Sequence, residues 1–288
     1  MNCQNVNCQN RLNWFRERIS KRSGYFMESH WYCSDPCLKT GILQRLEKSS
    51  RPKDRNPVVT HRIRIGLLLL EMGAITKEQL DLAIADQQRD SSQPHKERDE
   101  RIGHYLQSMG FIKERDITMA LSRQFSLPII NLANQRLNPK TLKMVPPLVM
   151  QRLKFLPLEY DVTGNSLSLV TSDPSFIPSM INLRGILNCD LSIFLGDETA
   201  VWELIQEAVA IDTETGKDTE PFADLSTEDL SELASSIVER ARDLQVKFLS
   251  VGYFNQLVWT RFSYGSEYID SVCEYVVVQQ NTPIESPA

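Results

Sequence analysis

The sequence predicts an α+β protein: a small cysteine-rich module, a tandem repeat of helix pairs packed on a small ββαβα domain, and a short helix–strand–strand domain. Three observations support this fold class. Four of the six cysteines lie within the first 37 residues, a 24-residue pattern occurs twice, and short apolar strands alternate with helical patterns after residue 151. A length of 288 residues is sufficient for two or three small domains.

The composition is that of a soluble globular protein, with 41% hydrophobic and 24% charged residues. The longest aliphatic run, from Ile65 to Leu70, is far shorter than the ~20 residues that span a bilayer. The N-terminus is polar and has no signal-peptide core. We therefore expect a cytoplasmic protein with no transmembrane segment of its own.

Charge is unevenly distributed along the chain. The net charge is −5, which argues against nucleic acid as a partner, whereas residues 1–64 hold 13 Lys and Arg against 5 Asp and Glu. A solvated surface accounts for this basic segment, and an acidic partner is the alternative.

The cysteines of the first module are paired by their spacing. Cys3 and Cys8 form a C-x4-C pair, and Cys33 and Cys37 form a C-x3-C pair. Four thiolates on two short turns suit tetrahedral zinc, and a segment of about 45 residues has too small a core to fold unaided. Two disulfides are the alternative, which the lack of an export signal disfavours. The sequence therefore predicts a structural zinc ion, and the string YCSDPC resembles the second knuckle of treble-clef-like zinc modules.

The 24-residue windows 64–87 and 101–124 match at nine positions when one is shifted by 37 residues. The identical pairs are Arg64/Arg101, Ile65/Ile102, Gly66/Gly103, Leu69/Leu106, Met72/Met109, Gly73/Gly110, Ile75/Ile112, Ala83/Ala120 and Gln87/Gln124. Agreement at this level indicates a duplicated supersecondary unit.

Each unit is predicted to be a pair of helices. The first helix runs from about Ile65 to Met72, and Gly73 follows where a left-handed C-cap is needed. Thr76 then opens the second helix, with Gln79 three residues later, as in a capping box. Leu80, Ala83, Ile84 and Gln87 share one face of that helix.

Three features of the repeat exceed what helix packing requires. A glycine in the first turn of a helix costs about 1 kcal/mol relative to alanine, and it leaves room for a ligand at the helix start. An Arg two residues earlier offers a planar fork that matches guanine O6/N7 or a phosphate. A Gln ends each second helix on the same face. Two such units suit a ligand that is itself twofold.

The doubled pattern RLGxxLxxxGxIxxxQLxxALxxQ resembles the MshEN domain, the N-terminal regulatory part of type II secretion and type IV pilus ATPases. The known ligand class of that domain is cyclic di-GMP, which both motifs hold. The resemblance therefore implies a non-catalytic module that binds a cyclic dinucleotide. It also implies a protein partner in a secretion, pilus or motility assembly.

Carried over by position, the resemblance implies a set of ligand-binding residues. Those of the first motif are Arg64, Ile65, Gly66, Leu69, Gly73, Gln79, Leu80 and Gln87. Those of the second motif are Arg101, Ile102, Gly103, Leu106, Gly110 and Gln124. This sequence departs from the family at Asp116, which replaces the Gln of the first copy, and in a longer spacer, Gln88 to Glu100. The spacer could loop out, or it could pull the two half-sites apart.

The resemblance continues into residues 125–210, where we expect a strand, a hairpin turn at Gly164-Asn165, a strand, a helix, a strand and a helix. Asp173-Pro174 ends the second strand, where the family carries a DP pair that can face the ligand. A plain helix N-cap is the alternative for Asp173. Cys189 and Cys273 stand alone in apolar strings and are expected in the core.

The C-terminal part predicts a helix from about Thr227 to Leu244 and strands at 246–254 and 257–264. No G-x-x-x-x-G-K-[ST] sequence, catalytic triad or carboxylate pair is present, and the four histidines are scattered. We therefore expect no enzyme.

The expected domain boundaries follow from these segments. They are 1–48 for the zinc module, 49–60 for a linker, 61–134 for the helical half of the MshEN-like domain, 135–210 for its α/β half, 211–224 for an acidic linker, 225–279 for a degenerate secretion-ATPase-like domain, and 280–288 for a tail. Three functions remain open: a cyclic-di-GMP receptor, a docking module that kept the fold without the ligand, and a zinc-headed regulator that contacts DNA.

Overall fold

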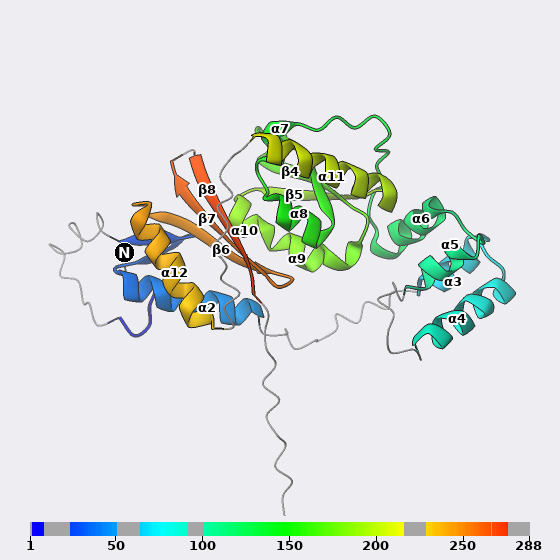
Figure 1. The fold of residues 1–288 in the computed structure, drawn as a ribbon, viewed down its shortest axis with the longest axis horizontal. Coiled ribbons are helices and arrows are strands. Elements are labelled where there is room, and N and C mark those ends of the chain that lie inside the picture. Colours follow the sequence, from blue (N-terminus) through cyan, green and yellow to red (C-terminus); the bar gives the residue numbers. More distant parts are fainter. Residues whose placement is uncertain are drawn as a thin grey trace, which may run out of the picture. The chain divides into compact units, whose positions relative to one another are not determined.

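The computed structural model describes residues 2–8, 24–50, 64–91, 101–215, 229–265 and 267–275. The chain forms two compact units (Figure 1). One, here called the terminal unit, comprises residues 1–55, 179–188 and 216–288. The other, the central unit, comprises residues 56–178 and 189–215. Among the described residues, no helix is both long and apolar enough to span a bilayer.

The terminal unit is built on a five-stranded sheet with strand order β2-β1-β6-β7-β8. The strands are β1 (Tyr25–Met27), β2 (His30–Tyr32), β6 (Phe248–Phe254), β7 (Leu257–Tyr264) and β8 (Glu267–Glu274). All pairs are antiparallel except β1 with β6, where Phe26 lies beside Phe248 and their rings stack at 5.1 Å. A segment near the N-terminus therefore joins a sheet from the C-terminal part.

Helices α2 (Asp35–Ser50) and α12 (Leu230–Asp243) pack against each other, and α2 packs on β6. One core holds apolar side chains from both ends of the chain: Leu38, Ile42, Leu46, Leu233, Ile237, Val251, Val258 and Phe262. Asp35 pairs with Arg242 across the two helices.

This arrangement differs from the expected division into separate modules 1–48 and 225–279. Two strands of three residues and one helix cannot bury enough apolar surface by themselves, so the N-terminal module completes its core with the C-terminal one. Strands β6 and β7 lie where expected, β8 was not predicted, and Cys273 is buried as expected.

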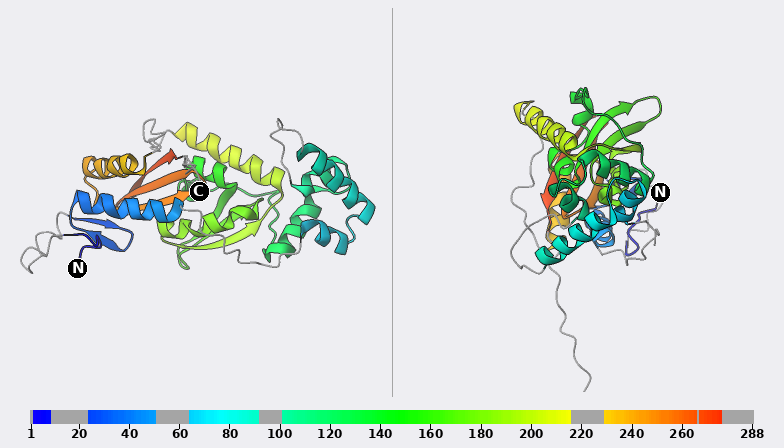
Figure 2. Two further views of the ribbon diagram at one scale, coloured as in Figure 1. Left: turned by 90° about the horizontal axis from the view of Figure 1, so that it is seen from below. Right: turned by 90° about the vertical axis from the view of Figure 1, so that its right-hand side faces the viewer.

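The helical half of the central unit consists of α3 (Ile65–Glu71), α4 (Lys77–Ser91), α5 (Ile102–Ser108) and α6 (Glu114–Phe125). This confirms the two helix pairs. The first helix of each repeat packs on the second helix of the other, α3 on α6 and α5 on α4, so the four helices form one bundle (Figure 2). Its centre contains matched residues of both repeats: Leu69, Leu106, Ala83 and Ala120.

The caps of these helices are as the sequence predicts. Gly73 and Gly110 have φ values of +68° and +73°, the left-handed conformation that glycine adopts without strain. Gln79 Oε1 accepts the Thr76 N–H at 2.9 Å, and Asp116 Oδ2 accepts the Lys113 N–H at 2.8 Å. Asp116 therefore serves the second helix pair in the position that Gln79 serves in the first.

The α/β half of the central unit has a three-stranded sheet of order β3-β4-β5. Its elements are α7 (Pro139–Leu142), α8 (Pro147–Leu153), β3 (Phe155–Asp161), β4 (Ser166–Thr171), a 3₁₀ turn (Pro174–Phe176), β5 (Asp190–Leu195) and α11 (Glu198–Thr215). β3 and β4 form the expected hairpin, and α11 packs on α8, β3 and β4. The short helices α9 (Ile177–Ile181) and α10 (Leu183–Leu187) lie between β4 and β5 in sequence.

Some boundaries differ from the sequence prediction. Residues 151–153, expected at the start of a strand, end α8 instead. α4 continues past Gln87 to Ser91, and α11 continues to Thr215, into the stretch expected to be a linker. The rest of the 88–100 spacer, most of both linkers and the 280–288 tail lie outside the described residues.

Candidate functional site

The second repeat and the α/β half of the central unit enclose a cavity of about 240 Å³. Helices α5 and α6 form one side of it, and the segments after β4 and β5 form the other. The predicted site residues on its lining are Ile65, Arg101, Ile102, Gly103, Gln124 and Asp173. Five of these six residues belong to the second motif or lie beyond it, and Ile65 comes from the start of the first motif.

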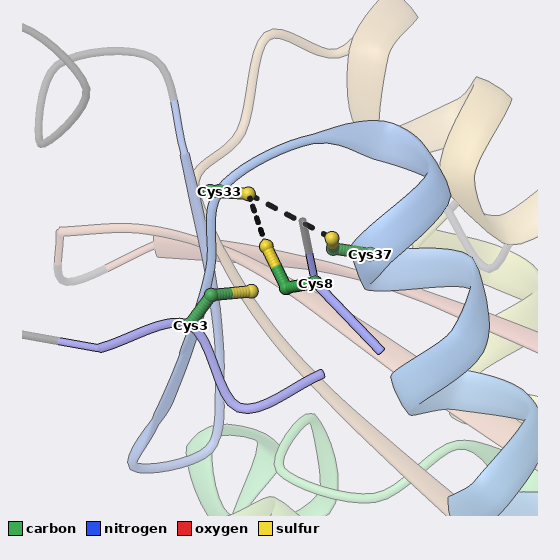
Figure 3. Close-up of side chains that lie close together, drawn as sticks. All are labelled: Cys3, Cys8, Cys33 and Cys37. Atoms are coloured by element: carbon green, nitrogen blue, oxygen red, sulfur yellow. Dashed lines mark hydrogen bonds between the residues drawn. The ribbon is translucent and has the colours of Figure 1, made fainter. Parts of the chain in front are cut away.

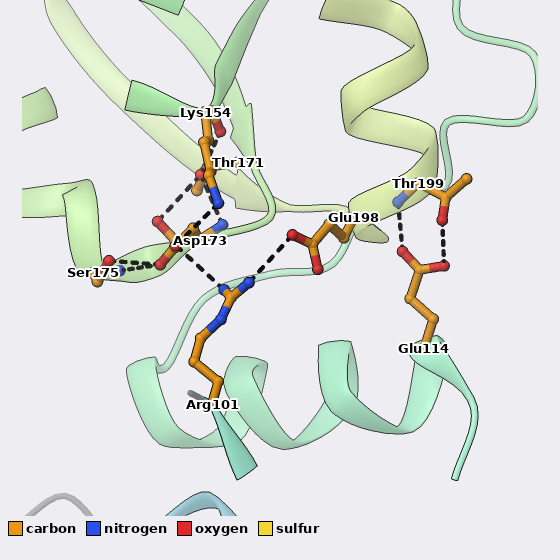
Figure 4. Close-up of polar contacts among 8 residues, drawn as sticks. All are labelled: Arg101, Glu114, Lys154, Thr171, Asp173, Ser175, Glu198 and Thr199. Carbon is orange, nitrogen blue, oxygen red and sulfur yellow. Dashed lines mark hydrogen bonds and ion pairs between the residues drawn. The ribbon is translucent and has the colours of Figure 1, made fainter. Parts of the chain in front are cut away.

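Arg101 is the cationic group of this cavity. It precedes α5 in an extended conformation, with φ −73° and ψ 128°, so it stands at the helix start. Its Nη1 lies 3.3 Å from Asp173 Oδ2, and its Nη2 lies 3.4 Å from Glu198 Oε1 (Figure 4). The guanidinium therefore bridges two carboxylates from two different segments of the α/β half.

Asp173 is an N-cap, one of the two roles considered for it, and it also lines the cavity. Its Oδ1 accepts hydrogen bonds from the Ser175 N–H at 3.1 Å and the Ser175 hydroxyl at 2.6 Å, which is an N-cap. Its Oδ2 faces Arg101, and Lys154 Nζ lies 4.0 Å from the same oxygen. The cap fixes the carboxylate so that one oxygen remains directed at the cavity.

Two further contacts fasten α6 to the start of α11. Glu114 accepts from the Thr199 N–H at 2.6 Å and from the Thr199 hydroxyl at 3.0 Å (Figure 4). The Thr118 hydroxyl donates to Asp197 Oδ1 at 2.6 Å. A carboxylate at the N-terminus of α11 suits the helix dipole. These bonds hold the two walls of the cavity together.

The remaining predicted ligand residues have other positions. Leu69, Leu80 and Leu106 are buried in the core of the helical bundle. Gly73 and Gly110 follow the C-caps of α3 and α5 in the left-handed conformation, and Gln79 belongs to a capping box. Arg64 and Gln87 do not line the cavity.

Helix packing explains one of the two glycines at the helix starts. A Cβ at Gly66 would lie 2.9 Å from Leu80 Cδ1, and one at Gly103 would lie 3.4 Å from Ile117 Cδ1. Gly66 thus lets α3 approach α4, whereas a Cβ at Gly103 would make only an ordinary van der Waals contact. Close packing is therefore a sufficient reason for glycine at position 66. Gly103, in contrast, lines the cavity.

Sequence reasoning missed Glu198, Glu114 and Lys154. Glu198 and Glu114 each begin a long helix, where a carboxylate is favoured, so their positions could have been found. Their partners come from distant segments, and no local pattern indicates that pairing.

The four N-terminal cysteines form a second candidate site, in the terminal unit. Their Sγ atoms all lie within 4.8 Å of one another (Figure 3). Cys33 lies 3.6 Å from Cys8 and 3.7 Å from Cys37, sulfur to sulfur. The predicted set Cys3, Cys8, Cys33 and Cys37 thus converges on one point, as tetrahedral ligands do.

The surroundings favour a thiolate at Cys37, whereas burial raises the pKa of Cys3. Burial raises the pKa of Cys37, but hydrogen bonds involving Ser34, Asn5, Cys33 and Cys8 outweigh it and hold that pKa at about 7. Asn5 Nδ2 donates to Cys37 Sγ at 3.3 Å. A thiolate is the form that binds a metal, so the cluster is compatible with zinc.

Residues 125–215 match the family model of the MshEN domain. Over these residues the chain is therefore similar to an MshEN domain. The matched range begins at Phe125, the last residue of α6, and so covers the α/β half that carries Asp173 and Glu198.

Proteins similar to this chain include two pilus ATPases. The chain is 29% identical over 147 residues to the type IV pilus assembly ATPase PilB of Myxococcus xanthus, covering 51% of this chain and 24% of that protein. It is 28% identical over 98 residues to the type IV pilus assembly ATPase PilB of Thermus thermophilus, covering 34% of this chain and 10% of that protein. The chain thus spans about a quarter or less of these relatives.

Solved structures similar to part of this chain include MshE with cdg, at 24% identity and a TM-score of 0.42, covering 51% of this chain and 99% of that chain. The N-terminal domain of XpsE is similar at 18% identity and a TM-score of 0.36, covering 50% of this chain and 92% of that chain.

Proposed function

We propose that residues 61–210, which include most of the MshEN match at 125–215, form a non-catalytic regulatory module that binds cyclic di-GMP. The observation that carries this proposal is the Arg101 guanidinium beside Asp173 and Glu198 at a cavity lined by the second repeat. A packing role alone does not require a cation and two carboxylates at a cavity edge.

This set of groups suits a guanine base. Guanine offers acceptors at O6 and N7, which a guanidinium can bind in a bidentate manner, and donors at N1 and N2, which a carboxylate can accept. Adenine has a donor where guanine has O6, so Arg101 would face it poorly. The site therefore favours guanine among purines.

The size of the cavity limits what it holds. Whole small-molecule sites have volumes of ~300–1,000 Å³, so a cavity of about 240 Å³ suits one base of the dinucleotide. In the duplicated pattern, Arg64 and Gln87 are the counterparts of Arg101 and Gln124. Because they do not line this cavity, we expect them to contribute less to binding.

Calorimetry with cyclic di-GMP tests the proposal. The wild-type protein should bind with a dissociation constant below tens of micromolar, and GTP or the linear dinucleotide should bind much less well because neither has two fixed phosphates. Absence of heat for cyclic di-GMP at that concentration would favour the docking alternative.

We also propose that Cys3, Cys8, Cys33 and Cys37 bind one structural zinc ion. Its support is the convergence of four sulfur atoms at the end of a core with contributions from both ends of the chain. Metal analysis of the purified protein should give about one zinc per chain. A metal-free protein with intact secondary structure would contradict this proposal.

A docking module is the second candidate function. Leu67 and Leu82, on the helical half, expose 53% and 58% of their surface, which is large for leucine. The partner would belong to a secretion, pilus or motility assembly. A protein that binds no nucleotide, yet loses association with such an assembly after Leu82→Asp, would support this function.

A further inference from the structure

The terminal unit contains a cavity of about 640 Å³ that lies on one face of its five-stranded sheet. Ser250 of β6 and Ser263 of β7 line this cavity. Each of them is next in sequence to a residue of the core under α2 and α12, Val251 and Phe262 respectively. Successive side chains of a strand point to opposite faces, so the cavity lies on the face of the sheet that is turned away from that core.

Helix α10 forms one wall of the cavity. Its Ile186 packs on β6 at Gly252, where a Cβ would lie 2.8 Å from Ile186 Cδ1. The glycine therefore lets α10 approach the sheet. Arg184 and Asn188 line the cavity from this segment. The side chain of Arg184 is exposed, and it forms no ion pair with any described residue.

Two phenylalanines form another wall. Phe26 of β1 and Phe248 of β6 are partners in the strand register, and their rings stack with centroids 5.1 Å apart and planes 14° apart. Both line the cavity, and 53% of Phe248 is exposed. An exposed aromatic ring at a cavity wall offers a flat apolar surface on which a second ring can stack.

The charges on the lining favour an anion. Among the described lining residues, Glu28 carries the one carboxylate, and Arg45 Nη2 lies 2.9 Å from its Oε1. That negative charge is therefore balanced, and the cation of Arg184 remains. The hydroxyls of Ser250 and Ser263 need hydrogen-bond partners when a ligand displaces water. The lining thus complements a flat ring that has polar edges and an anionic group.

We propose that this cavity binds a nucleoside monophosphate, with the base stacked on Phe248 and the phosphate at Arg184. Its volume falls within the ~300–1,000 Å³ of small-molecule sites. An aromatic side chain of a peptide has the ring without the anion, and inorganic phosphate has the anion without the ring. No described residue lines both this cavity and the Arg101 cavity, so the assignment does not depend on cyclic di-GMP binding.

Calorimetry with AMP tests this assignment, because the Arg101 cavity favours guanine and AMP carries adenine. The wild type should bind AMP. Adenosine lacks the phosphate and ribose 5-phosphate lacks the base, so each should bind roughly tenfold more weakly or worse. Phe248→Ala and Arg184→Gln should each weaken AMP binding by roughly tenfold, since the stacking surface or the cation is lost. Both side chains are exposed, and circular dichroism should show an unchanged fold.

Tyr264→Ala and Lys48→Gln are the matched controls. They change an exposed aromatic ring and an exposed cation of the same unit that do not line the cavity. Both should bind AMP as the wild type does, and so should Arg101→Ala. If Phe248→Ala does not fold, Phe248→Leu keeps an apolar side chain without the ring and should show the same loss.

Three results would overturn the assignment. The first is a wild type that does not bind AMP at millimolar concentration. The second is a Phe248 variant that binds AMP as tightly as Tyr264→Ala. The third is a loss of AMP binding in Arg101→Ala with full binding in Arg184→Gln, which would place the nucleotide in the central unit.

Discussion

Arg101 and Asp173 lie 72 positions apart in the sequence, and their Nη1 and Oδ2 atoms are 3.3 Å apart. The contact joins the start of the second helix pair to the end of β4. The side chain of Arg101 is 46% exposed and that of Asp173 is 14% exposed, so solvent weakens the pair. An ion pair of this kind contributes ~0–1 kcal/mol to stability. A ligand that displaces the pair therefore loses little binding free energy.

Asp173→Asn should separate the ligand role of this residue from its capping role. Asn is as good an N-cap as Asp, so the free energy of unfolding should change by less than about 1 kcal/mol. Affinity for cyclic di-GMP should fall roughly tenfold, because a carboxylate that accepts from guanine is lost. Calorimetry and thermal melting measure the two effects, with the exposed Asp190→Asn as the control. Equal affinity of both variants would remove Asp173 from the site.

Gln79→Ala should affect the helix and not the ligand. The Gln79 side chain accepts the Thr76 N–H, and loss of such a cap costs about 0.5–2 kcal/mol. Chemical denaturation should therefore show lower stability, and Asp116→Ala should behave alike because Asp116 caps the second pair. Cyclic di-GMP affinity should stay within about twofold of wild type. A large loss of affinity with unchanged stability would return Gln79 to the ligand site.

Cys33→Ser should destabilise the whole terminal unit. Cys33 and Cys37 belong to the same core as Leu38, Ile237 and Phe262, and structural zinc supplies much of the folding free energy of small modules. We expect loss of the zinc and of more than about 3 kcal/mol of stability, seen as a red shift in tryptophan emission, because Trp31 and Trp259 are buried there.

Cys189→Ser is the control for this variant, since Cys189 is also buried but lies in the central unit, outside the cluster. It should retain one zinc per chain. Cyclic di-GMP binding by the central unit should persist in Cys33→Ser. A zinc content that is equal in both variants would contradict the assignment of the ligands.

Asp270→Asn should cost the terminal unit about 3–5 kcal/mol. Asp270 accepts from Arg261 Nε and Nη2, both at 2.8 Å, and from Trp259 Nε1 at 2.9 Å. Arg261 and Asp270 are both buried, so the substitution removes the carboxylate charge that faces the buried Arg261 guanidinium. Urea unfolding measures the loss, and Asp243→Asn, at an exposed residue that ends α12, should cost less than about 0.5 kcal/mol. Equal midpoints for the two variants would refute this account of the pair.

The sequence predicted features that depend on neighbouring residues. The helix pairs, the left-handed Gly73 and Gly110, the capping box at Thr76 and the converging cysteines all follow from spacing over short distances. The sheet shared by both ends of the chain did not, because β1 pairs with β6 across more than 200 residues and nothing in the three residues of β1 indicates that partner. Part of the cavity lining was predicted. Arg101, Gly103 and Gln124 were named from the repeat, whereas Glu198 joins them only through the packing of α11.

The most direct test of the central claim is the affinity of wild type and Arg101→Ala for cyclic di-GMP, measured by calorimetry at one salt concentration. The account predicts binding by the wild type and a loss of roughly tenfold or more in Arg101→Ala, because a bidentate Arg–guanine contact is worth about 1–3 kcal/mol. Arg64→Ala should lose less, since Arg64 does not line the cavity. A wild type that does not bind, or an Arg101→Ala variant that binds as tightly as the wild type, would contradict it.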